Sequence, residues 1–358
     1  MLRIAPVVFV LLLFVTGCAP RDTPAPSQVI VLRHYGWETT VPDPEAEWNP
    51  TSYQVLVRAA GGFALLEEGQ GHQGYFNSLE KRSMHDASWV NGYEFVFGPA
   101  DNVVRIPDGS IVPNTDGLTV VAMRAAQPTE TRLLSRSGWR PRLWRDRIVA
   151  QIEDRIVLID SAGTMNDFVP GFLPEPQRHG PGICFQQTPV LEEDHWTAKP
   201  RLGALVVRWQ PARISGIPAA IQPAWTADGG VVAVQLGSEP AADAPWWRVP
   251  TKLVHLAGPN AAPVVVASDM HDPAPHPTLP MVAATDRDGR LVLIDLRGRP
   301  QAVLAEIGER PRWSGDGQRL LVEEPLQVAP KPDQTPAHAQ ALADQGRYVH
   351  VYVLKLGT

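Results

Sequence analysis

Histidines are the side chains in this sequence whose types and positions could support chemistry. The best placed are His271, which precedes Asp272, and His276. An imidazole can hold a metal ion or transfer a proton near neutral pH. However, the sequence has no His-Glu-x-x-His run, no Gly-x-Ser-x-Gly elbow and no phosphate-binding glycine loop. We therefore expect no catalytic residue, no metal and no cofactor, and we keep a hydrolase or lyase that uses His271 and His276 as the alternative.

The composition excludes one class of partner and permits a large core. The formal net charge is −6, which argues against a nucleic-acid partner because such a partner requires a basic face. Hydrophobic residues make up 44% of the chain and charged residues 20%, as in globular proteins. Only two cysteines are present, Cys18 and Cys184. We expect Cys184 to be a buried thiol that packs as a small apolar group.

The first eighteen residues have the pattern of an export signal. Arg3 precedes an apolar run from Ile4 to Val15, which is too short to cross a bilayer as a helix. Val15-Thr16-Gly17-Cys18 then resembles the lipobox of bacterial lipoproteins. The resemblance implies cleavage between Gly17 and Cys18 and an acyl-modified Cys18, with palmitate among its chains. Several acyl chains anchor a protein stably, whereas one chain binds only marginally.

The signal also predicts the location and the order of the segments. Residues 1–17 are the expected signal peptide, 18–28 the lipidated cysteine with a flexible tether, and 29–358 the folded domain. Ala19 follows the cysteine. In the lipoprotein family an Asp at that position retains the product at the inner membrane. We therefore expect the periplasmic side of the outer membrane, or the extracellular face of the cell membrane if the host is Gram-positive.

Two segments of the domain repeat closely. Pro223 to Val234 begins Pro-Ala-Trp-Thr-Ala-Asp-Gly, and Pro311 to Val322 begins Pro-Arg-Trp-Ser-Gly-Asp-Gly; an apolar strand pattern follows each. Gly accepts a positive φ in a tight hairpin turn, and Asp bonds the nearby backbone. Both copies resemble the repeat of TolB-type (WD40-like) β-propellers, although the proline of the Ser-Pro-Asp-Gly turn is absent from both. The resemblance implies a β-propeller.

Weaker copies around these two predict the rest of the ring. We name the strands of each unit A to D, with the motif on strand A. Val29 to Leu32, Tyr53 to Val57 and Phe63 to Leu66 give the first unit its B, C and D strands. That unit lacks a clear A strand and the last unit lacks a D strand. We expect an all-β propeller of seven four-stranded antiparallel blades, closed by pairing of the chain ends. Six blades, or a pair of β-sandwich domains, are the alternatives.

The long connections are expected at one end of the blades. The A–B and C–D turns are tight. The B–C and D–A connections carry most of the extra chain, including residues 36–52, 187–203 and 237–251 between B and C, and 169–182 and 268–279 between D and A. Long loops on a rigid scaffold are where function usually resides. Aromatic side chains are common anchors of protein interfaces, and five tryptophans lie in these expected loops: Trp37, Trp48, Trp196, Trp246 and Trp247.

The sequence thus predicts a non-catalytic, lipid-anchored envelope protein. Its expected partner is an envelope protein or peptide that these loops bind, and it contacts the membrane through the lipid alone. In the alternative, the hydrolase or lyase, the histidine site would lie at the central channel.

Overall fold

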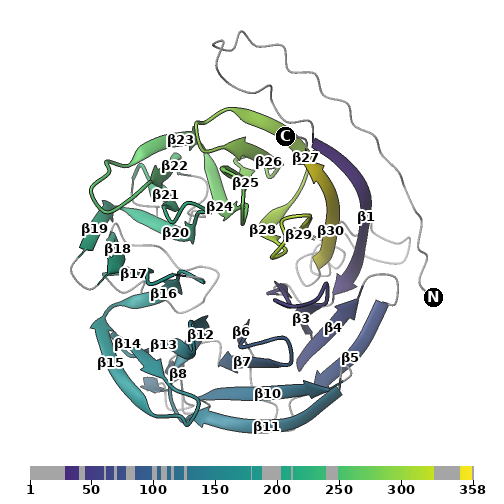
Figure 1. Ribbon diagram of the computed structural model, residues 1–358, viewed down its shortest axis with the longest axis vertical. Helices are drawn as coiled ribbons and strands as arrows, with labels where there is room; N and C mark the ends of the chain where they lie inside the picture. The colour runs from purple at the N-terminus through teal and green to yellow at the C-terminus, as the bar shows by residue number, and fades with distance from the viewer. Residues whose placement is uncertain are drawn as a thin grey trace.

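A computed structural model shows seven four-stranded antiparallel sheets around a central channel (Figure 1). The structure describes residues 29–39, 45–59, 62–67, 71–77, 85–98, 103–105, 111–113, 117–124, 127–178, 180–187, 203–210, 213–238, 249–325 and 347–356. The predicted seven-bladed propeller is confirmed. None of the described residues forms a helix long and apolar enough to cross a membrane.

The blades follow one another along the chain, each running from its innermost strand outward. Blade 1 holds β2 (Glu47–Trp48), β3 (Val55–Ala59), β4 (Gly62–Glu67) and β5 (Gly71–Asn77). Blade 2 holds β6 (His85–Trp89), β7 (Glu94–Gly98), β10 (Leu118–Arg124) and β11 (Gln127–Ser135). Between β7 and β10 lies a separate hairpin of β8 (Val103–Arg105) and β9 (Ile111–Pro113).

Blades 3 to 6 repeat the same order. Blade 3 holds β12 (Trp139–Trp144), β13 (Arg147–Ile152), β14 (Arg155–Ile159) and β15 (Met165–Pro170). Blade 4 holds β16 (Phe172–Pro176), β17 (Ile183–Gln186), β18 (Ala204–Gln210) and β19 (Arg213–Pro218). Blade 5 holds β20 (Ala220–Trp225), β21 (Val231–Leu236), β22 (Thr251–Leu256) and β23 (Val264–Ser268). Blade 6 holds β24 (Met270–Pro275), β25 (Met281–Asp286), β26 (Leu291–Asp295) and β27 (Pro300–Ala305).

Blade 7 joins the two ends of the chain. It holds β28 (Glu309–Trp313), β29 (Arg319–Pro325) and β30 (Arg347–Leu356), and the N-terminal strand β1 (Val29–Thr39) completes it from outside. Ten residue pairs join β1 to β30, from Val29 opposite Leu356 to Thr39 opposite Arg347. Figure 1 shows β1 following the outer edge of β30. The predicted closure by pairing of the chain ends is therefore confirmed.

The expected assignment of the first blade is wrong by one strand. Val29 to Leu32 belongs to the outermost strand of blade 7, and the segments around Tyr53 to Val57 and Phe63 to Leu66 form the second and third strands of blade 1. The innermost strand β2 has only two residues and carries no Asp-Gly turn. A strand that short leaves no periodic pattern, so the neighbouring strands were shifted to fill its place.

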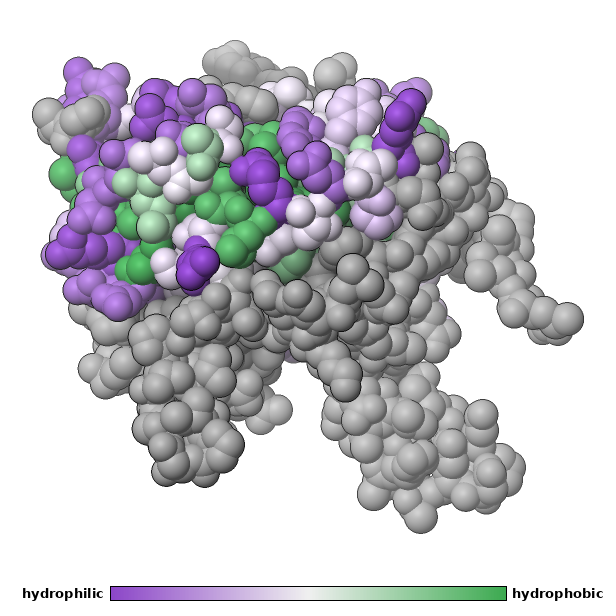
Figure 2. Space-filling view, turned by 90° about the horizontal axis from the view of Figure 1, so that it is seen from below, coloured by the Kyte–Doolittle hydropathy of each residue, from purple (hydrophilic) through white to green (hydrophobic). Residues whose placement is uncertain are grey.

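The core lies between neighbouring blades. Strands β21 and β25 are almost wholly buried, because another blade covers each face of their sheets. This arrangement explains their continuous apolar runs, which lack the alternation of a strand with one wet face. Cys184 lies in this core as predicted, and its burial raises the pKa of the thiol well above its ordinary range. The flank in Figure 2 shows apolar side chains interspersed with hydrophilic ones on the outer surface.

Candidate functional site

The innermost strands share a bulge that directs side chains into the channel. In five of the seven blades a residue with positive φ precedes a proline, and the pairing register shifts across that pair; the residues are Arg140, Leu173, Gln222, Asp272 and Arg310. A bulge re-aims the side chains next to it. Proline fits here because the innermost strand is an edge of its sheet. The side chain after each proline lines the channel: Arg142, Glu175, Ala224, Ala274 and Arg312.

This bulge also explains an error in the predicted loops. Residues 169–182 and 268–279 were expected as long D–A connections, but the innermost strands β16 and β24 lie within them. Their x-Pro pairs, Leu173-Pro174 and Asp272-Pro273, resemble loop signals in the sequence. In the structure each pair lies within a bulged strand. The connections that remain between these blades are short.

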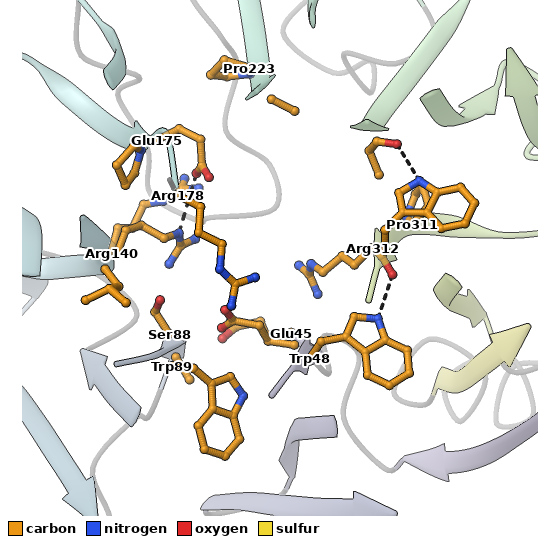
Figure 3. A pocket seen from close by; sticks show the side chains of 18 of the residues that line it. Glu45, Trp48, Ser88, Trp89, Arg140, Glu175, Arg178, Pro223, Pro311 and Arg312 are labelled. Atoms are coloured by element: carbon orange, nitrogen blue, oxygen red, sulfur yellow. Dashed lines mark hydrogen bonds and ion pairs between the residues drawn. The ribbon is translucent and has the colours of Figure 1, made fainter. Parts of the chain in front are cut away.

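A cavity of about 440 Å³ occupies the channel, and its lining carries both signs of charge (Figure 3). Blades 1, 3, 4 and 7 contribute the charged residues, which are Glu45, Glu47, Arg140, Arg142, Glu175, Arg178 and Arg312. Blades 5 and 6 contribute Pro223, Ala224, Pro273 and Ala274. The cavity therefore has a charged side and a small, apolar side.

The charged groups are partly matched within the lining. Arg142 Nε lies 3.7 Å from Glu175 Oε2. Glu323 lies behind the lining and is only 1% exposed. It forms ion pairs with Arg310 at 3.1 Å and with Arg312 at 3.4 Å. Burial raises the pKa of the Glu47 carboxyl, although the charges of Arg142, Arg312 and Arg178 act in the opposite direction. Glu47 thus retains a carboxyl group whose negative charge the surrounding arginines do not fully stabilise.

Indole groups bridge neighbouring blades around this cavity. The Nε1 atom of Trp48 donates to Arg312 O at 2.9 Å, that of Trp313 to Ala274 O at 3.0 Å, and that of Trp225 to Glu175 O at 3.0 Å. In each case the acceptor is the channel-lining residue after the proline of the preceding blade. The indoles of blades 7 and 1 appear in Figure 3 with their donor bonds. These tryptophans are inter-blade anchors, as their repeated position in the sequence indicates.

Two of the five tryptophans expected in the loops lie on strands in the structure. Trp48 is not in a loop: it lies in β2, is 4% exposed and borders the cavity. Trp37 is not in a loop either, since it lies in β1, is half-buried, and contacts Tyr35 edge-on at 5.3 Å. Both positions were misplaced because β1 continues to Thr39 at the start of the expected connection at 36–52, and the short strand β2 lies near its end. Trp196, Trp246 and Trp247 lie outside the described residues, as do Gly17 and Cys18.

The two candidate histidines lie at different ends of β24. His276 follows the strand in the A–B turn and is 3% exposed. Its Nε2 bonds Gly317 O of blade 7 at 3.0 Å, and its Nδ1 accepts the Leu279 amide at 3.0 Å. Burial lowers its pKa. Both nitrogens of the neutral ring therefore have partners within the fold, which leaves His276 no nitrogen for a ligand.

His271 lies near the start of β24 and belongs to a polar group that joins blades 5, 6 and 7. Its Nδ1 is 3.1 Å from Asp272 Oδ2, while the Asp272 amide donates to Gln222 Oε1 at 2.9 Å. Burial alone would lower the pKa of His271 and raise that of Asp272. Their contact outweighs burial, so the pKa of His271 is raised and that of Asp272 is lowered. Among the described residues, no three His, Cys, Asp or Glu side chains are grouped as metal ligands.

The sequence reasoning missed the charged channel residues. A signal for them was present: the motif Pro-x-Trp marks the residue between proline and tryptophan as channel-facing, and Arg312 and Ala224 occupy that position in the two clearest repeats. The other five blades carry Glu47, Ser88, Arg142, Glu175 and Ala274 there. That one column of the repeat identifies one channel-facing residue in each blade.

Comparisons with known proteins agree with the architecture. No protein-family model matches the chain, and no curated protein matches it. A solved structure of Kuenenia stuttgartiensis hydrazine synthase is similar, with a TM-score of 0.54 and 12% identity, over 79% of this chain and 93% of that one. The structure of BamB from Moraxella catarrhalis matches with a TM-score of 0.49 and 10% identity, over 90% and 99%. At 12% identity the first likeness bears on the fold alone, and neither likeness assigns an activity to this chain.

Proposed function

We propose that this protein is a lipid-anchored, non-catalytic envelope protein that binds a protein or peptide partner through the insertions at one end of its blades. One observation carries the proposal. The four long connections between second and third strands span residues 99–117, 187–203, 237–250 and 326–346, and all begin at the same end of the ring. Every connection at the opposite end is short. A rigid scaffold with insertions gathered at one end is typical of a binding surface.

The position of Val29 gives the proposed anchor a direction. Because β1 runs antiparallel to β30, Val29 lies beside Leu356 at the end of the ring opposite the insertions. A lipid on Cys18 would attach the protein from that side, through residues 19–28. The insertions would then be presented away from the point of attachment, toward a partner in the periplasm or at the outer membrane.

Photocrosslinking in intact cells tests the binding surface. We would place a photoreactive phenylalanine at Trp247, in the insertion of blade 5, and at Gly258, in the short turn at the opposite end of the same blade. Gly258 is a matched control because no atom lies within 4 Å of a Cβ added there. We expect a discrete crosslinked protein from position 247 and none from position 258, and Trp246→Ala should reduce its yield. Equal crosslinking from both positions would exclude the insertion end as the binding surface.

The lipid anchor is tested separately. Mass spectrometry of the mature N-terminal peptide should show an acylated Cys18, and Cys18→Ser should release the protein from the membrane fraction. An unmodified N-terminus elsewhere in the first thirty residues would contradict the anchor while leaving the binding surface intact.

The alternative, a hydrolase or lyase, depends on His271 and its contact with Asp272. Elemental analysis of the purified protein, compared with His271→Ala, tests it. A stoichiometric metal that His271→Ala removes would favour this alternative over a binding protein.

A further inference from the structure

The end of the ring opposite the insertions, which we call the short-turn end, carries most of the exposed large apolar side chains. It holds the A–B and C–D turns and the first residues of β1. Nine large hydrophobic side chains are exposed among the described residues, and two of them, Leu133 and Tyr348, lie toward the insertions. The other seven lie in the turns of the short-turn end or within four residues of it on a strand: Leu32, Tyr53, Tyr93, Met165, Ile214, Val264 and Val265.

The longest apolar stretch at this end belongs to blade 5. The residues from Ala261 to Val265 are all exposed, and no residue from Ala257 to Ser268 is charged. Consecutive exposed apolar residues are unfavourable in water unless they serve a contact. The Ser215 hydroxyl of blade 4 donates to Pro259 O at 2.5 Å, which ties this turn to the neighbouring blade. The stretch is thus an apolar surface that the fold holds in place.

Blade 2 carries the most exposed of the seven side chains. Tyr93 is 74% exposed in the A–B turn of this blade. Its amide donates to Asn91 Oδ1 at 2.7 Å and its carbonyl accepts the Met123 amide at 2.6 Å, so its backbone is fixed while its ring remains exposed. Tyrosine, with an apolar ring and a polar hydroxyl, is enriched where a membrane meets water. Figure 1 shows β7 of blade 2 and β23 of blade 5 on opposite sides of the channel.

The seven side chains surround the ring and do not form a single patch. Among the described residues, every blade except blade 6 contributes at least one of them. Tyr53 contributes least, because the Arg319 guanidinium covers its ring and its hydroxyl donates to Asp316. A protein partner of standard size covers about 800 Å² on one side of a molecule. Contacts spread over six blades are covered together by an extended, flat surface.

The chain before β1 indicates which flat surface this is, and this step rests on the lipid anchor of the proposed function. Val29 lies at the short-turn end, and residues 18–28 connect it to Cys18. Even fully extended, this connection covers at most about 40 Å. An acylated Cys18 therefore keeps the short-turn end beside the bilayer. A second copy of the chain would have to bury the same end that the tether holds against the lipid.

We propose that the short-turn end of the ring lies against the phospholipid surface. Tyr93 contacts the headgroups on one side of the ring, and Ala261 to Val265 contact them on the other. This contact adds to the acyl chains on Cys18. Because the tether holds the end nearby, contacts that are weak individually act at a high effective concentration. The channel then runs along the membrane normal, and the insertions point away from the bilayer.

Fluorescence quenching of the full-length, lipidated protein in vesicles of phosphatidylethanolamine and phosphatidylglycerol tests this orientation. An environment-sensitive dye is attached to Tyr93→Cys or to Val264→Cys at the short-turn end. The matched controls are Tyr348→Cys and Leu133→Cys, which replace exposed side chains of similar chemistry toward the insertions. The dyes at 93 and 264 should lose most of their quenching by aqueous iodide when the protein moves from detergent to vesicles. They should also be quenched by a phospholipid that carries a spin label near its headgroup. The dyes at 348 and 133 should show neither change.

Each other outcome overturns the proposal. Equal quenching by iodide at all four positions would show that the short-turn end lies in water. Protection from iodide without quenching by the lipid label would indicate contact with a second copy. The wild type should take up no dye, because Cys184 is buried and the Cys18 thiol is acylated. Labelling of Cys18 in the wild type would contradict the anchor itself and this orientation with it, whereas water-exposed dyes on an acylated protein would contradict the orientation alone.

Discussion

The outer seam of blade 7 and the inner boundary between blades 6 and 7 lie in the same part of the ring but are held by different contacts. At the seam, ten residue pairs join the backbones of β1 and β30. At the boundary, the inner strands β24 and β28 belong to different sheets. Side chains join them there: Trp313 Nε1 donates to Ala274 O, and His276 bonds Gly317 O.

The difference shows that two kinds of contact stabilise the ring: backbone pairing at the seam and side-chain contacts at the boundary. Backbone pairing is insensitive to side-chain identity, so the seam tolerates exposed and varied residues such as Leu32 and Arg33. The boundary depends on particular side chains, and for that reason the repeated Pro-x-Trp motif lies on the innermost strands. Four changes test this comparison, in order of decreasing expected effect.

Deletion of residues 1–39 should have the largest effect, because it removes β1 and leaves β30 as an unpaired edge. We expect loss of the cooperative thermal transition, monitored by circular dichroism. Deletion of residues 1–28 alone, which keeps β1, is the control. If both truncated chains unfold at the same temperature, the seam contributes nothing to stability.

Trp313→Ala should have the next largest effect. It removes a partly buried indole that packs against the blade 6–7 core and donates to Ala274 O. Large-to-small changes of buried aromatics cost about 3–5 kcal/mol in the free energy of unfolding. Trp313→Phe keeps most of the packing and loses the donor, which costs about 1 kcal/mol. Urea denaturation measures both, and similar losses for the two variants would show that the bond, not the packing, holds this boundary.

Gly317→Ala should have an intermediate effect. Gly317 has φ of +70°, and an added Cβ would lie 2.4 Å from Nε2 of the buried His276 ring. Gly289→Ala is the control, because its φ is +85° but no atom lies within 4 Å of its Cβ. The control should lose about 1 kcal/mol from backbone conformation alone. Gly317→Ala should lose more of the free energy of unfolding than Gly289→Ala. Equal losses would mean that the His276 ring shifts to admit the methyl group without destabilising the fold.

Lowering the pH should produce the smallest effect, at the seam. His34 Nε2 lies 2.8 Å from His350 Nδ1, and its ring stacks on Tyr352 at 4.5 Å. Burial first, and then the charge of His350, lower the pKa of His34 from 6.5 to about 4. The unfolded chain therefore takes up this proton at a higher pH than the folded protein does, so stability falls as the pH falls from about 6.5 to about 4. The effect is small because part of the His34 side chain remains in contact with solvent, which screens its charge.

Melting temperatures of the wild type and of His34→Gln across this range isolate that contribution. The variant should lose less stability than the wild type as the pH falls. A parallel decline in the two proteins would assign the pH dependence to other groups, such as His276 or His255, whose pKa values burial also lowers.

The sequence by itself predicted the propeller fold and favoured seven blades over six. The turns Thr226-Ala-Asp-Gly and Ser314-Gly-Asp-Gly place Gly229 and Gly317 at positive φ, and the apolar strands after them are buried on both faces. These are local effects of turn chemistry and hydrophobic pattern, so they can be recognised in a single chain. The unpaired first and last units predicted the seam for the same reason, since each unit must complete four strands.

Only the tertiary structure decided where the charges and aromatic groups lie. The bulges that turn Glu175 and Ala274 into the channel arise in strands that the sequence presents as loops, because an x-Pro pair carries the same local signal in both. Arg178 and Glu47 line the same cavity, as do Ala274 and Arg142, only because seven blades close around one axis. These residues are far apart in the chain and become neighbours only when the ring closes, so no local sequence pattern indicates that they meet.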